Sequence, residues 1–419
     1  GVLRLAEFAK SPGDVGFTLA RGKLVAEDEE IIPKLLDHEN QNIVSLAISY
    51  SSRRFFDEKW DWVDGFVRDA WSANSLVNLA LAIRDDDRVW EFVEKHGEIV
   101  EEKYWTQVSK YILPITEENI SYAVSMLLKY NRPFSAIEVL SHAAYNKMDL
   151  SPQLVMDTLF EAVETIDKTN ETIESALHEI GELFKFLQEK SESDNDLYVS
   201  RLAQLEWQYL AVLNGYNGKP TTLERYLCVD PKFFADMIGA IYRSENEDSE
   251  SAETISEEKK RIADNAYRLL YDWKTVPGTQ QDETVDEGIL LKWANEARNF
   301  CKESGHIGIC DDHIGQVLAH APGEKADGSW PCVSVRNVIE KVASSSLEDG
   351  FVVGIFNKRG TVTKSVYEGG RQERALSKEY AEYARKSEIE WPRTAVALRR
   401  VADHYEDYAK REDEEAASR

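Results

Sequence analysis

The sequence predicts an all-α protein, a superhelical array of antiparallel helix pairs of the tetratricopeptide or HEAT type, with one β-hairpin near the C-terminus. Apolar residues recur at spacings of three and four along most of the 419 residues, which is the period of a helix that buries one face. Short segments rich in Pro, Gly and Asn separate these stretches. The clearest helix pairs span about 35 residues each, within the range of roughly 34 to 47 for helical repeats.

The repeat array is predicted for residues 1–243. Residues 116–129 and 133–144 carry apolar stripes on either side of a turn at 130–133 that contains Asn and Pro, and Ser151-Pro152 provides the N-cap and first-turn proline of the next pair. Residues 221–224, Thr-Thr-Leu-Glu, have the spacing of a capping box. Further helices are expected at residues 1–9, 31–36, 43–50, 60–73, 76–83, 154–166, 173–187, 196–213 and 231–238.

An acidic segment separates this array from a C-terminal helical subdomain, residues 261–419. Glu, Asp and Ser dominate residues 244–260, which lack an apolar stripe, so we expect a solvated, mobile loop there. Residues 412–419 are expected to be a charged tail that frays. The helices expected in the subdomain are at residues 262–273, 287–300, 335–342 and 373–385, with a last helix that begins at 391.

The β-hairpin is predicted at about residues 351–367. Residues 352–356 and 361–367 are β-branched and aromatic runs of strand length, and the Asn-Lys-Arg-Gly between them is typical of a turn. Residues 351–411 contain thirteen Lys and Arg against nine Asp and Glu. We interpret the basic residues near the hairpin as solvated charges, and docking of an acidic partner is the alternative. They are Lys358, Arg359, Lys364, Arg371 and Arg374.

Composition excludes several classes of function. The net charge of −26 repels phosphate backbones at long range and argues against a general nucleic-acid-binding role. No apolar run approaches the roughly 18 to 20 residues that a membrane span requires, and the N-terminus does not have the plan of a secretion signal, so we predict a cytoplasmic protein. The four cysteines are too few for a disulfide scaffold, and we expect thiols at Cys228, Cys301, Cys310 and Cys332.

No catalytic signature occurs, so we expect a chain that is not an enzyme and has no cofactor. Phosphate-binding loops, dinucleotide fingerprints, HExxH, GxSxG and the kinase motifs have no match. One group resembles the ligand set of zinc, with two thiols and two imidazoles within 13 residues: Cys301, His306, Cys310 and His313. Because the spacing C-x4-H-x3-C-x2-H matches no zinc-finger pattern, we interpret the group as part of a loop between helices. In this interpretation Asp311 and Asp312 cap a helix that begins near His313, and a zinc site is the alternative.

Several short sequence motifs are distributed along nearly the whole chain: Trp90-Glu91, Tyr104-Trp105, Arg132-Pro133, Leu205-Glu206-Trp207, Asp230-Pro231-Lys232-Phe233-Phe234, Trp330-Pro331 and Gly370-Arg371-Gln372-Glu373-Arg374. In these motifs the sequence resembles the C-terminal helical portion of very large bacterial proteins, some of them related to antiviral STAND NTPases. The C-terminal solenoids of those NTPases recognise phage proteins. The resemblance therefore implies a sensor or scaffold module joined to an N-terminal effector.

The predicted function is a non-catalytic protein-recognition module that binds a protein ligand, for which the resemblance implies a phage protein. Helical spacing begins directly at Gly1 with no cap before it, so we expect a C-terminal fragment of a larger bacterial defence protein. The alternatives are a metal-dependent enzyme or structural zinc protein that uses the Cys301 to His313 group, and an oligomerisation scaffold.

Overall fold

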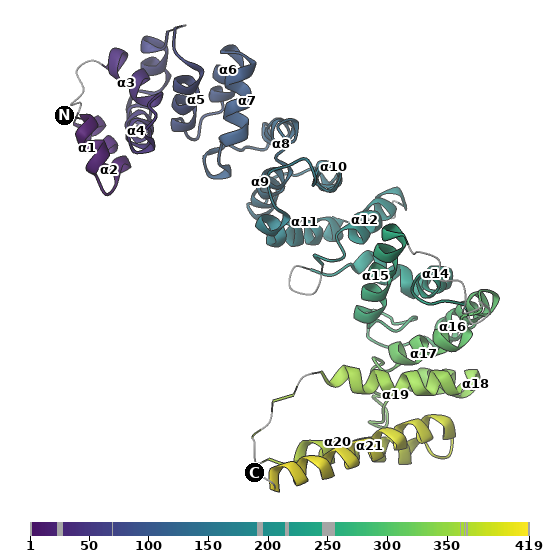
Figure 1. The fold of residues 1–419 in the computed structure, drawn as a ribbon. Coiled ribbons are helices and arrows are strands. Elements are labelled where there is room, and N and C mark those ends of the chain that lie inside the picture. The colour runs from purple at the N-terminus through teal and green to yellow at the C-terminus, as the bar shows by residue number, and fades with distance from the viewer. Residues whose placement is uncertain are drawn as a thin grey trace. The chain divides into compact units, whose positions relative to one another are not determined.

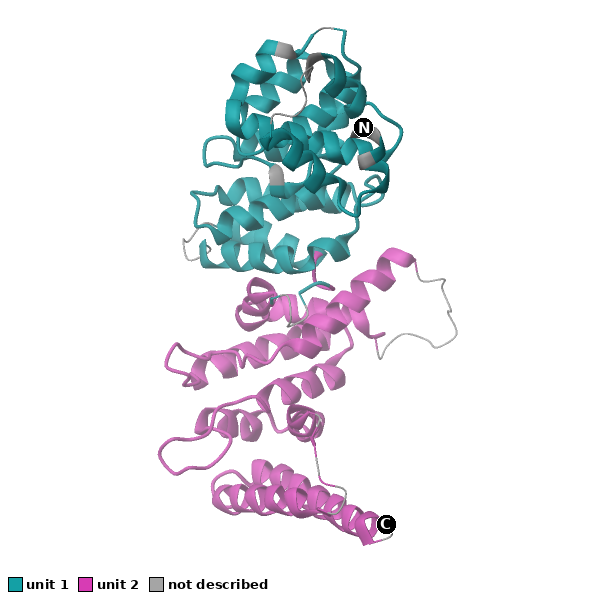
Figure 2. Ribbon diagram, turned by 90° about the vertical axis from the view of Figure 1, so that its left-hand side faces the viewer, with its two compact units in different colours: residues 1–208, 212–218 teal, residues 209–211, 219–419 magenta. Residues whose placement is uncertain are grey.

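The chain forms two compact units, residues 1–208 with 212–218 and residues 209–211 with 219–419 (Figure 2). A computed structural model describes residues 2–22, 28–68, 70–190, 196–213, 218–244, 256–360, 362, 363, 365 and 368–417. The acidic segment predicted to separate two parts of the chain lies within the second unit. Its residues 245–255 lie outside the described residues, and residues 257–260 are the first turn of a helix whose N-cap is Ser256.

Unit 1 is an array in which each helix packs mainly on the helices one or two positions along the chain. Thus α8 packs on α9, α9 on α10 and α11, and α10 on α12. This nearest-neighbour packing is typical of helical repeats and confirms the predicted all-α array. Its elements, labelled in Figure 1 where there is room, are α1 (Val2–Phe8), α2 (Pro12–Arg21), α3 (Asp28–Leu36), α4 (Gln41–Phe66), α5 (Ala73–Ala82), α6 (Arg88–Lys95), α7 (Glu98–Gln107), η1 (Lys110–Ile112), α8 (Ile120–Lys129), α9 (Pro133–Tyr145), α10 (Pro152–Glu164), η2 (Ile173–Ala176), α11 (Leu177–Lys190) and α12 (Asp196–Gln208).

The pair α8 and α9 shows how the sequence produces this packing. The left-handed conformation of Asn131, with φ 56°, ends α8, and the Arg132 N–H donates to the Leu127 carbonyl over 2.8 Å. This closure is a Schellman motif, and Pro133 then begins α9 with its preset φ. Because the connection is so short, the two helices run antiparallel. The stripe predicted for the first helix is buried throughout: Ile120, Ala123, Val124 and Leu127.

Unit 2 is also helical. In it α14 packs on α15 and α16, α17 on α19, and α20 on α21. Across the described residues of both units the one extended pairing is a single antiparallel bridge between Thr279 and Val285. None of the described helices combines the length and apolar character needed to cross a bilayer. The helices of unit 2 are α13 (Thr221–Val229), α14 (Pro231–Ile241), α15 (Glu257–Asp272), α16 (Glu287–Glu303), α17 (Ile307–Leu318), α18 (Val333–Val342), α19 (Ser345–Arg359), α20 (Arg371–Ser387) and α21 (Pro392–Ala417).

The predicted β-hairpin at 351–367 is wrong. Its first strand, residues 352–356, lies inside α19, because Leu347, Phe351 and Ile355 recur at every fourth residue and bury one helical face. The described residues of the second strand, 362, 363 and 365, are not in a strand, and residues 361, 364, 366 and 367 lie outside the described residues. The β-branched run therefore follows tertiary packing rather than its local preference.

Glycines allow α19 to approach α17 unusually closely. A Cβ atom on Gly350 would lie 1.9 Å from the carbonyl oxygen of Asp312, and one on Gly315 would lie 2.0 Å from that of Leu347. Gly354, one turn after Gly350, faces the next turn of α17, where its Cβ would lie 2.6 Å from the Gln316 carbonyl oxygen. No residue larger than glycine fits this crossing without displacement of the backbone.

Two helix boundaries also differ from their predictions. Residues 43–50 and 60–73 were expected as two helices, but residues 43–50 and 60–66 belong to one helix, α4, which is kinked at Lys59 (φ 54°) and ends at Phe66. The capping box at 221–224 is not formed, because Pro220 is the N-cap and Thr221 is already helical. The N-cap at Ser151 is confirmed, since its side chain accepts from the Leu154 N–H.

The C-terminal tail, predicted to fray over 412–419, is helical as far as Ala417. Asp413 explains this difference. Its carboxylate accepts the Gly370 N–H over 2.9 Å and pairs with Arg374, and both partners belong to the start of α20. The last turns of α21 are therefore fastened to α20.

The basic residues near the predicted hairpin mostly contact unit 2 itself. Arg359 pairs with Glu373 over 2.6 Å, and the Lys358 Nζ lies 5.3 Å from the centroid of the Trp330 ring. Arg374 pairs with Asp413 as described above. These three residues therefore have partners within unit 2. This arrangement supports neither the interpretation as solvated charges nor the alternative, docking of an acidic partner.

We predict opposite effects for one substitution at two glycines of unit 2. Gly350→Ala should lower the free energy of unfolding by about 1–3 kcal/mol, because its methyl group meets the α17 backbone. Gly239→Ala in α14 should raise it by about 0.5–1 kcal/mol, because the nearest atom to its Cβ, on His306, lies 3.9 Å away. Hydrogen exchange of peptides from unit 2 measures both. Equal protection in the two variants would contradict the close crossing of α17 and α19.

Candidate functional site

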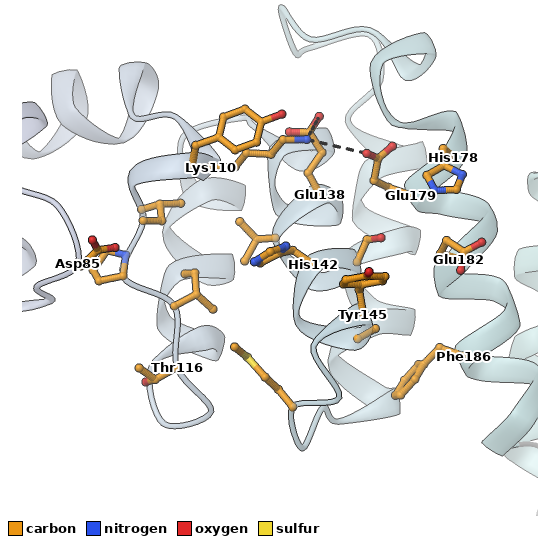
Figure 3. A pocket seen from close by; sticks show the side chains of 18 of the residues that line it. Asp85, Lys110, Thr116, Glu138, His142, Tyr145, His178, Glu179, Glu182 and Phe186 are labelled. Carbon is orange, nitrogen blue, oxygen red and sulfur yellow. Dashed lines mark ion pairs between the residues drawn. The ribbon is translucent and has the colours of Figure 1, made fainter.

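Unit 1 contains an open groove with a volume of about 1310 Å³ (Figure 3). Its walls come from the turn before α6, from residues 110–116 including η1, from α9 and from α11. The buried residues of its lining include Leu113 and Val139, while charged and aromatic side chains occupy its exposed parts. We call this feature the unit 1 groove.

A partly buried ion pair joins the segments that lead into three walls of the unit 1 groove. The Arg132 guanidinium donates to the carbonyl oxygens of Trp105 (3.0 Å) and Val108 (2.6 Å), which are left free at the end of α7. It also donates to Glu171 over 3.1 Å. Glu171 in turn accepts the backbone N–H of Phe134 over 2.9 Å at the start of α9. One pair of charges thus ties the end of α7, the start of α9 and the segment before α11.

Lys110 links α9 and α11 across the groove. Its Nζ lies 2.9 Å from Glu138 of α9 and 3.8 Å from Glu179 of α11, as the dashed lines in Figure 3 mark. Burial acts to lower the pKa of Lys110, but the hydrogen bond to Glu138 and the charges of Glu138 and Glu179 outweigh it, so the pKa is raised. Lys110 is therefore a protonated bridge and not a general base at neutral pH.

The exposed parts of the groove are acidic and aromatic. Seven carboxylates line it against two lysines, Lys110 and Lys185, and Lys185 pairs with Glu182 over 2.6 Å. Tyr111 and Tyr145 are each 84% exposed, although both are large and partly apolar. The seven carboxylates are those of Asp85, Asp86, Asp87, Glu138, Glu179, Glu182 and Glu189.

Within the described part of the chain, no three His, Cys, Asp or Glu side chains converge in a way that would hold a metal ion. The Nε2 atom of His142 in the groove lies 3.0 Å from the side-chain amide nitrogen of its helix neighbour Asn146. Exposed rings above an apolar lining are typical of surfaces that hold another molecule.

The residues considered as zinc ligands lie in unit 2 and have protein partners. Cys301 of α16 and Cys310 of α17 are both fully buried, and a hydrogen bond to Cys301 together with burial raises the pKa of Cys310, so its thiol stays protonated. The Nε2 atom of His306 lies 3.1 Å from the Tyr242 carbonyl oxygen, and that of His313 lies 3.0 Å from the Tyr242 hydroxyl. Hydrogen bonds and packing therefore account for all four.

The helix expected to begin near His313 begins at Ile307 instead. Asp311 and Asp312 consequently lie inside α17 and do not cap it. Asp311 pairs with Arg298 of α16 over 2.7 Å, and Asp312 accepts from Gln316 one turn later.

His320, just after α17, is held neutral by its surroundings. Burial, assisted by the charges of Lys358 and Lys274, lowers the pKa of His320 to about 4. In the unfolded chain the pKa of histidine is about 6.5. Protonation in this interval therefore favours unfolding of unit 2.

Neither a protein-family model nor a curated protein matches this chain. The groove must therefore be interpreted from its own residues. Sequence reasoning missed it, because its lining extends from Asp85 to Glu189 and only the packing of unit 1 brings these residues together. The acidic run 85–87 and the aromatic residues Tyr111 and Tyr145 were the available signals.

We predict that Arg132→Met lowers the free energy of unfolding of unit 1 by about 2–4 kcal/mol, because it leaves the charge of Glu171 without its cation and two carbonyl groups without their donor. Arg132→Lys should recover only part of this loss, since an ammonium group cannot reproduce the planar fork of the guanidinium. Urea unfolding measures both variants. Full stability of either variant would show that the Arg132 contacts do not fix the walls.

We predict that His320→Gln changes the pH dependence of unit 2. The lowered pKa of His320 gives stability that is complete above about pH 6.5 and is lost as the pH falls toward 4. The variant does not lose this stability on acidification. The difference between its melting temperature and that of the unsubstituted chain should therefore become more positive as the pH falls from 7 to 5. Thermal unfolding at both values tests this, and a constant difference would contradict it.

Proposed function

We propose that this chain is a protein-recognition module of the cytoplasm and that the unit 1 groove binds a segment of another protein. The observation that carries this proposal is the pair of tyrosines, Tyr111 and Tyr145, which are each 84% exposed on segments that the Arg132 contacts join. Aromatic side chains of this kind are enriched among the residues that dominate binding energy at protein interfaces.

The size of the groove supports a macromolecular ligand. Its volume of about 1310 Å³ exceeds the roughly 300–1,000 Å³ that is typical of small-molecule sites. It is also open along the surface rather than enclosed. A nearest-neighbour helical array is suited to this task, because its exposed face can accept a long segment without disturbance of the packing between helices.

The resemblance to the C-terminal solenoids of antiviral STAND NTPases supports a more specific form of the proposal. In that form the ligand is a phage protein, and the module acts as a non-catalytic sensor for an N-terminal effector of the same bacterial polypeptide. The motif Arg132-Pro133, on which the resemblance partly rests, contains the arginine that joins the segments leading into the groove walls.

A displayed library of random peptides, selected on the purified chain, tests the proposal. Selected peptides should bind at least about tenfold more weakly to the Tyr111→Ser/Tyr145→Ser double variant, because loss of two anchors costs more than 1.4 kcal/mol. The control is Tyr267→Ser/Tyr271→Ser, which removes two exposed, stacked rings from α15 in unit 2. Absence of selected peptides, or equal loss in both variants, would contradict the proposal.

A further inference from the structure

We infer that the unit 1 groove selects a basic segment, one in which lysine or arginine alternates with apolar residues. This inference rests on the proposed function and adds to it the chemistry of the partner. It follows from the charge of the groove, from the freedom of its carboxylates and from the position of its rings.

The charge of the groove is strongly negative where a ligand would lie. Seven carboxylates face two lysines, and each lysine is already neutralised by a glutamate of the groove, Lys110 by Glu138 and Lys185 by Glu182. An entering cation therefore meets surplus carboxylates, and both lysines of the lining are already paired with one. Complementary charge of this kind steers association and rejects partners of the wrong sign.

Several of these carboxylates are available to a ligand. The side chains of Asp85 and Glu189 make no hydrogen bond or ion pair with the described residues. The Asp87 carboxylate accepts only from the neutral amide of Asn119, over 3.2 Å, which leaves its charge uncompensated. Glu182 holds Lys185 in an exposed pair three residues apart, which contributes little to stability and can be exchanged for a ligand cation.

The rings of the groove are placed to receive cations. The Lys110 Nζ lies 5.2 Å from the centroid of Tyr111, and the Lys190 Nζ lies 5.8 Å from that of Phe186, so two rings already hold ammonium groups at cation–π distance. No cation of the described residues lies over Tyr145. An arginine of the ligand can stack on Tyr145 and pair with a neighbouring carboxylate at the same time.

Other occupants fit less well. Phosphate-bearing and acidic ligands are repelled, and a second copy of this chain, with its net charge of −26, is repelled as a whole. A small polyamine has the right charge but no apolar groups for the exposed rings and the apolar lining. A basic segment of another protein satisfies the charge, the rings and the volume together.

Fluorescence anisotropy with synthetic peptides tests the inference. The probes are a peptide of alternating Arg or Lys and Leu, and its analogues with Gln or Glu at the basic positions. We expect the basic peptide to bind at least about tenfold more tightly than the Gln analogue, and its affinity to fall with added salt. Tighter binding of either analogue overturns the inference.

Charge reversal locates the effect. Glu182→Lys/Glu189→Lys changes two positions two turns apart on α11 and should weaken the basic peptide by about tenfold or more. Glu102→Lys/Glu164→Lys changes the net charge equally at exposed helical positions outside the groove and should alter binding less than about twofold. Equal weakening by the two double variants overturns the inference, because it would show attraction to the acidic chain as a whole.

The remaining outcomes separate this inference from the proposed function. If library peptides that depend on Tyr111 and Tyr145 are neutral or acidic, recognition stands and the basic partner is wrong. If spermine competes as strongly as the basic peptide, the groove holds small polycations and the inference is overturned. The same holds if light scattering shows self-association that Glu182→Lys/Glu189→Lys abolishes, because the occupant is then a second copy.

Discussion

The contact between Arg132 and Glu171 is the interaction on which unit 1 depends. It satisfies carbonyl groups at the end of α7 and N–H groups at the start of α9, so two helix termini that would otherwise face each other unsatisfied become partners through a single ion pair. Because Glu171 precedes η2 and α11, the same contact also sets where the third wall begins. The chain thereby holds a concave surface open without help from a ligand.

A groove that is already open affects the free energy of binding. A surface that must be formed on binding loses part of its interaction energy to ordering, whereas a surface fixed in advance does not. In the unit 1 groove the rigid parts are the backbone and the bridge of Lys110 between Glu138 and Glu179. The adaptable parts are exposed carboxylates and tyrosines at the periphery. In such a groove the helices fix the shape, while the exposed charges can adjust to the ligand. This combination suits recognition of ligand segments by their residue composition more than by one exact conformation.

The sequence predicted what depends on neighbouring residues and missed what depends on distant ones. The stripe of α8 and the Ser151 cap are local patterns, and the structure confirms them. The hairpin prediction was wrong because residues 352–356 prefer strands by composition, while Gly350 and Gly354 permit a helix crossing whose partner, α17, lies more than thirty residues earlier. The groove was missed for the same reason, since Glu171 meets Phe134 across 37 positions.

The glycine crossing between α17 and α19 limits how unit 2 can deform. Where carbonyl oxygens of one helix occupy the space that Cβ atoms would need on the other, a slide of one residue would bring a side chain such as that of Phe351 against the backbone of α17. Shear between these helices is therefore blocked, although shear is the usual small motion of packed helices. In any deformation of unit 2 the two helices must therefore move together as one body. The change of backbone conformation then falls on the connections beside them.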